Sequence, residues 1–269
     1  MRYGNCAYFK DADKIKILKN IGFDYIETGL ASLNDATETE IAEFVALLGE
    51  NNIKCEAVNV LFPGGISLTG ENADFSKAAE YIAAIFEKTK NIGFKTVVFG
   101  SGGARKVPEN FPKEKALEQI KKVICDFLIP AAEKYDFTVA LEELNRNETN
   151  IINTIEEAED LIAQVNHPRI KLVADLYHIA VEDANGVKKL SGMGDIIAHC
   201  HIANPYNNRY YPGVSDSEKS KDLYKAFFAA LKSSGYDGKI SIEGNIADEK
   251  NFYEESKTSL EFMKSINNK

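Results

Sequence analysis

"FTVALEELNRNETNIINTIEEAEDLIAQVNHPRIKLVAD", residues 137–175, contains the repeating unit on which this chain is built. Residues 137–143 and 170–175 are short apolar runs bounded by polar residues, which are typical of strands. Between them, residues 154–165 place apolar side chains at helical spacing, and a Thr-x-x-Glu capping box opens this stretch. The segment therefore predicts a strand, a helix and a second strand, the unit that connects parallel strands.

Similar strand-like runs recur along the whole chain, with helical patterns between them. The eight runs are residues 2–8, 24–29, 54–60, 95–100, 137–143, 170–175, 196–202 and 239–244. Eight strand–helix units in about 250 residues are typical of a (β/α)8 TIM barrel. We expect one such barrel domain over residues 1–269, because no linker divides the chain. A doubly wound open sheet is disfavoured, since no Gly-rich phosphate-binding motif follows the first run.

Composition narrows the classes of function. The chain is 44% hydrophobic, which is enough for a sizeable core, and its net charge is −9. An acidic chain repels phosphate backbones, so we expect no nucleic-acid partner. Four scattered cysteines without a CxxC pair indicate reduced, mostly buried thiols in a cytoplasmic protein. The first residues lack the apolar core of a signal peptide and no apolar run is long enough to cross a bilayer, so we expect neither secretion nor a membrane span.

Polar residues stand where several of the predicted strands end. In a TIM barrel these carboxyl ends form the catalytic face. The fifth run ends in Glu142 and Glu143, and the later runs end in Asp175, His201 and Glu243. Three carboxylates and one imidazole are therefore expected on one rim.

The alternation of side chains along a strand predicts which of these residues point toward the barrel axis. In the fifth run, the apolar residues Phe137, Val139 and Leu141 suit the helix layer, so Glu142 points inward and Glu143 outward. The same count directs inward Asp175, His199, His201 and Glu243. It directs outward Ala198, Cys200 and Ile202.

Glu142, Asp175, His201 and Glu243 together offer a hard donor set, rich in oxygen. Such a set suits Mn²⁺, Mg²⁺ or Co²⁺ better than a structural zinc site, which would use thiolates. We expect one divalent metal ion here, with Mn²⁺ favoured and Zn²⁺ still open. The alternative is that each carboxylate is an ordinary solvated group at a strand end.

The chain resembles the xylose isomerase-like barrel superfamily. The resemblance is to the ketose 3-epimerases (D-tagatose and D-psicose 3-epimerase) and to their sugar phosphate isomerase/epimerase relatives. It is carried by "LEELNRNE" (141–148), "ADLYHI" (174–179), "HCHIAN" (199–204), "RYYPG" (209–213) and "SIEG" (241–244).

This resemblance implies roles for particular residues. It implies that one divalent metal is bound by Glu142, Asp175, His201 and Glu243. It implies proton transfer by Glu142 and Glu243, and substrate binding by Glu148, His178 and Arg209. The expected function is a metal-dependent sugar epimerase or isomerase, acting on a ketose or ketose phosphate by proton abstraction next to the carbonyl through an enediolate.

Other functions stay open at this point. A keto-inositol dehydratase or a related lyase would share the first proton abstraction, with His178 as the acid for the leaving hydroxyl. A non-catalytic sugar-binding protein is disfavoured by the intact ligand set. The DNA-repair endonuclease branch is disfavoured because the chain has only four histidines and a negative charge. The expected partner is a small-molecule sugar, with a homodimer or homotetramer left open.

Several further residues are candidates for secondary roles. His199 is expected to pack or to support His201 rather than bind the metal, and Glu27 and Glu56 are expected to be structural or solvated rather than to reach the pocket. Residues 100–112 are expected to form a mobile lid, a plain long loop or a phosphate cradle using Arg105 and Lys106. An unphosphorylated substrate is favoured over that cradle. Phe62 is expected to line the sugar pocket.

Overall fold

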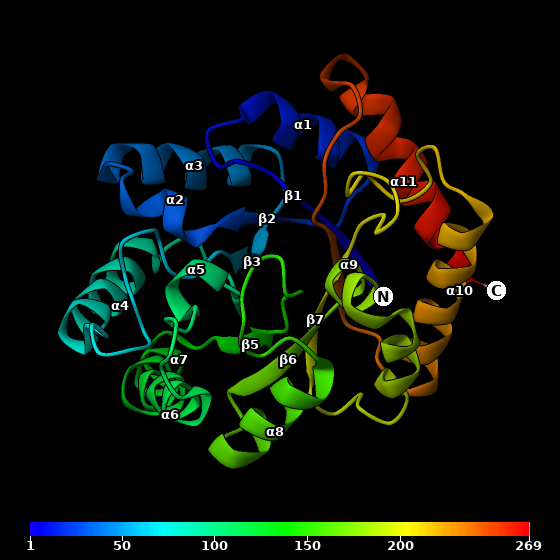
Figure 1. Ribbon diagram of the computed structural model, residues 1–269. Coiled ribbons are helices and arrows are strands. Elements are labelled where there is room, and N and C mark those ends of the chain that lie inside the picture. Colours follow the sequence, from blue (N-terminus) through cyan, green and yellow to red (C-terminus); the bar gives the residue numbers. More distant parts are fainter. Residues whose placement is uncertain (269) are drawn as a thin grey trace.

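The computed structural model describes residues 1–268, and its strands close into a barrel (Figure 1). All neighbouring strands are parallel and follow chain order, with β1 pairing to β8. The strands are β1 (Arg2–Cys6), β2 (Tyr25–Gly29), β3 (Cys55–Asn59), β4 (Thr96–Phe99), β5 (Thr138–Glu142), β6 (Ile170–Asp175), β7 (Ile197–Ile202) and β8 (Lys239–Ile242). The predicted (β/α)8 barrel and its eight strands are confirmed.

Helices surround the barrel and separate successive strands (Figure 1). They are α1 (Ala12–Ile21), α2 (Leu30–Asn34), α3 (Glu38–Glu50), α4 (Phe75–Thr89), α5 (Gly102–Arg105), α6 (Lys113–Val123), α7 (Ile129–Tyr135), α8 (Ile155–Val165), α9 (Leu176–Asp183), α10 (Glu218–Ser233) and α11 (Phe252–Asn267). A π-helical turn, Ile124–Leu128, joins α6 to α7, and 3₁₀ turns cover Ala184–Leu190 and Glu249–Asn251. Within residues 1–268, no helix has the length and apolar character needed to cross a membrane.

The helix α8 shows how sequence sets these boundaries. Thr154 precedes the helix in an extended conformation, and its hydroxyl accepts the N–H of Glu157 at 3.2 Å. This satisfies one of the N–H groups that a helix start leaves without a partner. At the other end, Asn166 takes the left-handed conformation (φ 49°) and closes the helix.

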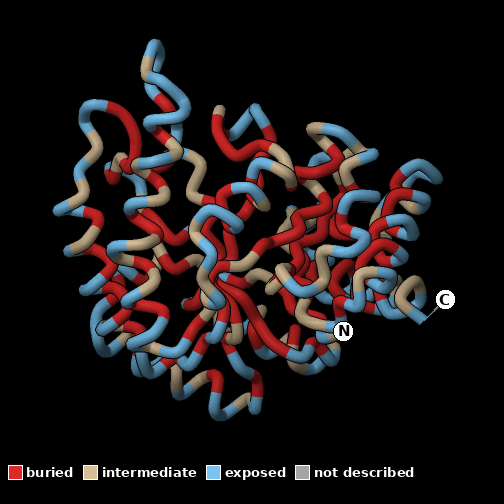
Figure 2. The backbone as a smooth tube through the Cα atoms, turned by 90° about the horizontal axis from the view of Figure 1, so that it is seen from below, coloured by how far each residue is buried: buried red, intermediate tan, exposed pale blue. Residues whose placement is uncertain are grey.

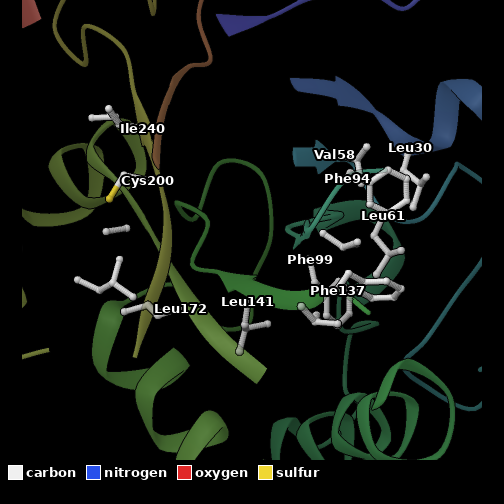
Figure 3. Packing of buried hydrophobic residues seen from close by; sticks show 14 of the residues in the cluster. Leu30, Val58, Leu61, Phe94, Phe99, Phe137, Leu141, Leu172, Cys200 and Ile240 are labelled. Atoms are coloured by element: carbon white, nitrogen blue, oxygen red, sulfur yellow. The ribbon is translucent and has the colours of Figure 1, made fainter. Parts of the chain in front are cut away.

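The main hydrophobic core lies between the strands and the helices. Figure 3 shows outward-facing residues of this layer, among them Leu141, Leu172 and Cys200. The rings of Phe86 on α4 and Phe137 before β5 lie 4.5 Å apart, which ties a helix to the barrel. Figure 2 shows the same arrangement, with the central strands buried and the outer sides of the helices exposed.

The barrel interior holds a separate small cluster of Val98, Ala140 and Val173. Its separation from the outer core confirms the alternation predicted along these strands. Ala198 is the exception: it packs against the interior cluster, although it was expected to face outward. The reason is a shift in register, because Ile197 pairs with Leu172 while His199 pairs with Val173. Ala198, between these two pairs, has no partner on β6 in this register, so the regular alternation does not hold for its side chain.

The described cysteines carry free thiols. Cys55 and Cys200 are buried, whereas Cys6 and Cys125 are half-buried, so the expectation of mostly buried thiols holds for two of the four. Burial raises the pKa of the Cys200 thiol well above its ordinary value, which keeps the group protonated and unreactive.

Candidate metal centre

Four side chains from neighbouring strands converge at the carboxyl end of the barrel. Glu142 ends β5, Asp175 ends β6, His201 lies on β7 and Glu243 directly follows β8. One donor atom from each residue lies within 4.8 Å of the donor atoms of the others. His201 Nδ1 is 2.9 Å from Glu142 Oε1, 3.5 Å from Glu243 Oε2 and 3.8 Å from Asp175 Oδ2. The structure thus brings the four predicted ligands together.

Asp175 shows most directly that this cluster fits a cation. Its Oδ1 accepts the N–H groups of Tyr177 at 2.7 Å and His178 at 3.3 Å, which caps α9. Its Oδ2 is buried and has no hydrogen-bond partner among residues 1–268. Leaving a buried acceptor without a partner costs about 1–3 kcal/mol, and more when it is charged. A divalent cation coordinated by this oxygen would remove that cost.

The crowding of carboxylates leads to the same conclusion. Burial raises the pKa of Glu243 to about 7, with His201 lowering it and Glu142 raising it. Burial alone would also raise the pKa of Asp175, but His178, together with Arg209 and His201, holds it below the usual value. Three carboxylates at such short range are more stable around a positive charge than alone. The donor set therefore fits one hard divalent cation.

The other side of the His201 ring contacts a residue that was not expected in the site. Its Nε2 lies 3.0 Å from Glu27 Oε1, and Glu27 Oε2 lies 2.8 Å from His199 Nε2. All three side chains are fully buried. Burial alone would lower the pKa of His201, but Glu27 and then Glu243 raise it well above its ordinary value. Glu27 is thus neither solvated nor remote, and His199 lies behind the site as expected.

Alternation along β2 could have located Glu27. Ile26 belongs to the outer core, so Glu27 must face the barrel interior. Glu27 lies in the middle of its strand, whereas site residues were expected at strand ends, so this role was not predicted.

His178 was predicted to bind substrate, and its ring is held in one orientation. The backbone N–H of Asn145 donates to His178 Nδ1 at 3.2 Å, and the amide Nδ2 of Asn145 lies 2.7 Å from the same atom. Because Nδ1 accepts, the ring proton is at Nε2. That atom lies 3.6 Å from Asp175 Oδ2, so an N–H donor borders the candidate metal-binding cluster.

Arg209 and Glu148, the other two predicted substrate residues, lie at the same rim. Arg209 Nε donates to the Glu243 carbonyl oxygen at 3.1 Å, and its terminal nitrogen donates to the Glu243 carboxylate. Its guanidinium also lies 4.5 Å from the centre of the Tyr177 ring. Glu148 is partly exposed, and its Oε1 lies 3.6 Å from Arg209 Nη1. The seven predicted site residues therefore form one continuous group.

The arrangement agrees with a comparison of the whole chain with known protein families. The family model described as "Xylose isomerase-like TIM barrel" matches residues 15–266. The chain belongs to this family.

Relatives of this xylose isomerase-like barrel include named sugar epimerases. The 3-dehydro-D-guloside 4-epimerase of Escherichia coli (strain K12) is 27% identical over 255 residues, covering 91% of this chain and 92% of that protein. The L-ribulose 3-epimerase of Methylomonas sp. (strain DH-1) is 28% identical over 227 residues, covering 82% of this chain and 74% of that protein.

Solved structures share the fold over the full length. A D-psicose 3-epimerase crystallised in the presence of D-fructose superimposes with a TM-score of 0.80 at 18% identity and covers 100% of both chains. The IOLI protein with a bound zinc atom gives a TM-score of 0.67 at 20% identity, covering 99% of this chain and 96% of that one.

The expected position of Phe62 in this xylose isomerase-like barrel was wrong, whereas the phosphate cradle was already disfavoured. Arg105 does not offer a phosphate site, because it is fully buried and donates to the carbonyl oxygens of Phe99 at 3.1 Å and Glu142 at 2.6 Å. Residues 100–112 form a loop that contains the short helix α5. Phe62 does not line the pocket but packs in the outer core, with its ring 5.5 Å from that of Phe99.

Two further residues, Glu56 and Asn59, lie at opposite ends of the barrel. Glu56 pairs with Arg2, the first residue of β1, and so lies at the opposite end of the barrel from the site. This agrees with the expectation that Glu56 is structural. Asn59, at the end of β3, was missed: its amide donates to Glu243 Oε1 at 2.8 Å and fixes that carboxylate from the side opposite Arg209. A polar residue closing a strand was the available signal.

Proposed function

We propose that this protein is a divalent-metal-dependent sugar epimerase that inverts a carbon next to the carbonyl group of a ketose. The observation that carries the proposal is the placement of Glu142 and Glu243. These carboxylates come from β5 and from the end of β8, and both approach His201 Nδ1. The epimerase names of the relatives support the reaction class.

Inversion requires one group that removes a proton from carbon and another that returns it to the opposite face. Carboxylates perform such transfers when they are held within hydrogen-bonding distance of the reacting atom. Glu142 would serve one face of the carbon and Glu243 the other. Asn59 and Arg209 hold the two oxygens of Glu243, so this carboxylate keeps its direction while the substrate reacts.

The metal ion would be held by Glu142, Asp175, His201 and Glu243, with Mn²⁺ as the favoured ion. When bound, it would supply positive charge to the substrate oxygens and so make the adjacent carbon more acidic. A zinc-containing neighbour of the same fold supports a metal in this class of barrel.

The substrate would be bound by the donors and acceptors around the cluster. The Nε2–H of His178 and the guanidinium of Arg209 can donate to hydroxyl or carbonyl oxygens, and Glu148 can accept from a hydroxyl. A free ketose is favoured over a phosphorylated one. The support is that Arg105, the residue that kept the phosphate alternative open, is buried against the backbone of β4 and β5.

A lyase acting on a keto-inositol is the second candidate. It is favoured by one observation, the N–H of His178 beside the cluster, because an acid at that position could protonate a departing hydroxyl. The two functions share the first step and differ in the product.

A substrate panel with metal removal tests the proposal. The protein would be treated with a chelator and then assayed on free ketoses, their terminal phosphates and keto-inositols, with and without Mn²⁺. We expect epimerisation of a free ketose that depends on Mn²⁺. Dehydration of a keto-inositol, or equal turnover without metal, would contradict the proposal.

A further inference from the structure

The buried carboxylate of Glu27 lies directly behind the candidate metal centre and has no part in the reaction proposed above. It is in the middle of β2, across the barrel from β7. Each of its oxygens faces one imidazole: Oε1 is 3.0 Å from His201 Nε2 and Oε2 is 2.8 Å from His199 Nε2. The three side chains have no solvent exposure, so water cannot replace either contact.

The direction of the His201 ring depends on what Nε2 contacts. Nδ1 faces the carboxylates of Glu142, Asp175 and Glu243, and it can bind a cation only when it carries no proton. The ring proton must then be at Nε2, where a buried N–H needs an acceptor. Among residues 1–268, Glu27 Oε1 is the acceptor that the hydrogen bonds place there.

We propose that Glu27 is a positioning residue of the metal centre, which holds the His201 ring with Nδ1 directed at the cation and Nε2 protonated. The inference rests on the proposed function, because it presumes a divalent cation at the cluster. The negative charge of Glu27 also increases the electron density that His201 offers to the cation. Glu27 touches neither substrate nor reacting atoms in this arrangement.

His199 allows this role to be separated from a purely structural one. Its Nδ1 is buried with no hydrogen-bond partner in the described chain, so its proton can move from Nε2 to Nδ1 without breaking another hydrogen bond, and the new N–H then has no acceptor. In Glu27→Gln, the amide oxygen would accept from His201, and the amide N–H₂ would donate to His199 Nε2 after that shift. The variant would thus keep both contacts and lose only the charge.

The first test measures Mn²⁺ affinity rather than activity. Metal-stripped parent, Glu27→Gln and Glu56→Gln would be titrated with Mn²⁺ against a competing chelator, and their metal-free thermal midpoints compared. Glu56 is the matched control, since it is a glutamate on the next strand that pairs with Arg2 at the other end of the barrel. We expect affinity weakened by ~10–100-fold in Glu27→Gln, and unchanged affinity in Glu56→Gln.

The outcomes distinguish a failure of the role proposed for Glu27 from a failure of the proposed function. If the parent binds Mn²⁺ and folded Glu27→Gln binds it equally well, the negative charge of Glu27 does not act on the metal centre and that part of the proposal is wrong, while the proposed function stands. If the parent binds no divalent metal, both are wrong.

A second measurement needs no variant and decides the matter if Glu27→Gln fails to fold. Nitrogen-15 NMR of the Zn²⁺-loaded parent should show His201 protonated at Nε2 and bare at Nδ1. A His201 ring protonated at Nδ1, or bound to the metal through Nε2, would overturn the proposal.

Discussion

Gly100, directly after β4, leaves the space that the Glu142 carboxylate occupies. A Cβ added at this position would lie 2.1 Å from Glu142 Oε2 and 3.3 Å from its Cδ. Ordinary contact begins at 3.4 Å, so the carboxylate would have to move by more than 1 Å. The backbone of Gly100 is outside the left-handed region, so alanine itself fits the chain there. Gly100→Ala therefore displaces the carboxylate proposed for proton transfer without straining the backbone.

We expect this substitution to reduce kcat/KM by ~10²-fold, because a misplacement of about 1 Å has that effect on an oriented catalytic group. The assay is epimerisation of the ketose that the parent turns over fastest, at saturating Mn²⁺, together with the thermal midpoint. Gly103→Ala is the control, since within the described structure no atom lies within 4 Å of the added Cβ. Parent-like activity in folded, metal-loaded Gly100→Ala would refute the placement of Glu142 at the reacting carbon.

Three further predictions concern the same end of the barrel. Asp175→Ala should abolish stoichiometric metal binding, measured by elemental analysis of the purified protein; full metal content would remove Asp175 from the ligand set. Glu142→Gln and Glu243→Gln should each lower turnover by ~10²–10⁴-fold while the circular dichroism spectrum is retained, and near-parental rates would exclude that residue from proton transfer. Arg105→Met should lower the free energy of unfolding by ~1–3 kcal/mol per carbonyl oxygen left without a donor, measured by urea denaturation; unchanged stability would show that its hydrogen bonds are replaceable.

The sequence predicted the barrel and the convergence of the four candidate ligands because both depend on local periodicity. Strand alternation alone selected Glu142 over Glu143. The structure confirms the difference, since Glu143 faces away from the cluster and accepts the N–H of Asp175 at 3.2 Å. Burial, and next the charge of Asp175, raise the pKa of Glu143 well above its ordinary value.

The expectations that failed depend on contacts between distant segments. Ala198 turned inward because β7 shifts register against β6, which no pattern within β7 reveals. Arg105 was considered for a phosphate cradle, yet it is the last residue of α5 and donates to the backbone of β4 and β5. Glu27 meets its partners across the barrel, at sequence separations of 172 and 174 residues. Such pairings appear only once the barrel is closed.

Turnover of the ketose in D₂O tests the central claim most directly. Two carboxylates on different sides of the carbon exchange protons with solvent between removal and return, so the product should carry one deuterium at the inverted carbon and retain all of its oxygen atoms. Mass spectrometry and proton NMR of the product would show both features. A product lighter by one water would instead identify a lyase, and an inverted carbon without deuterium would contradict proton transfer by Glu142 and Glu243.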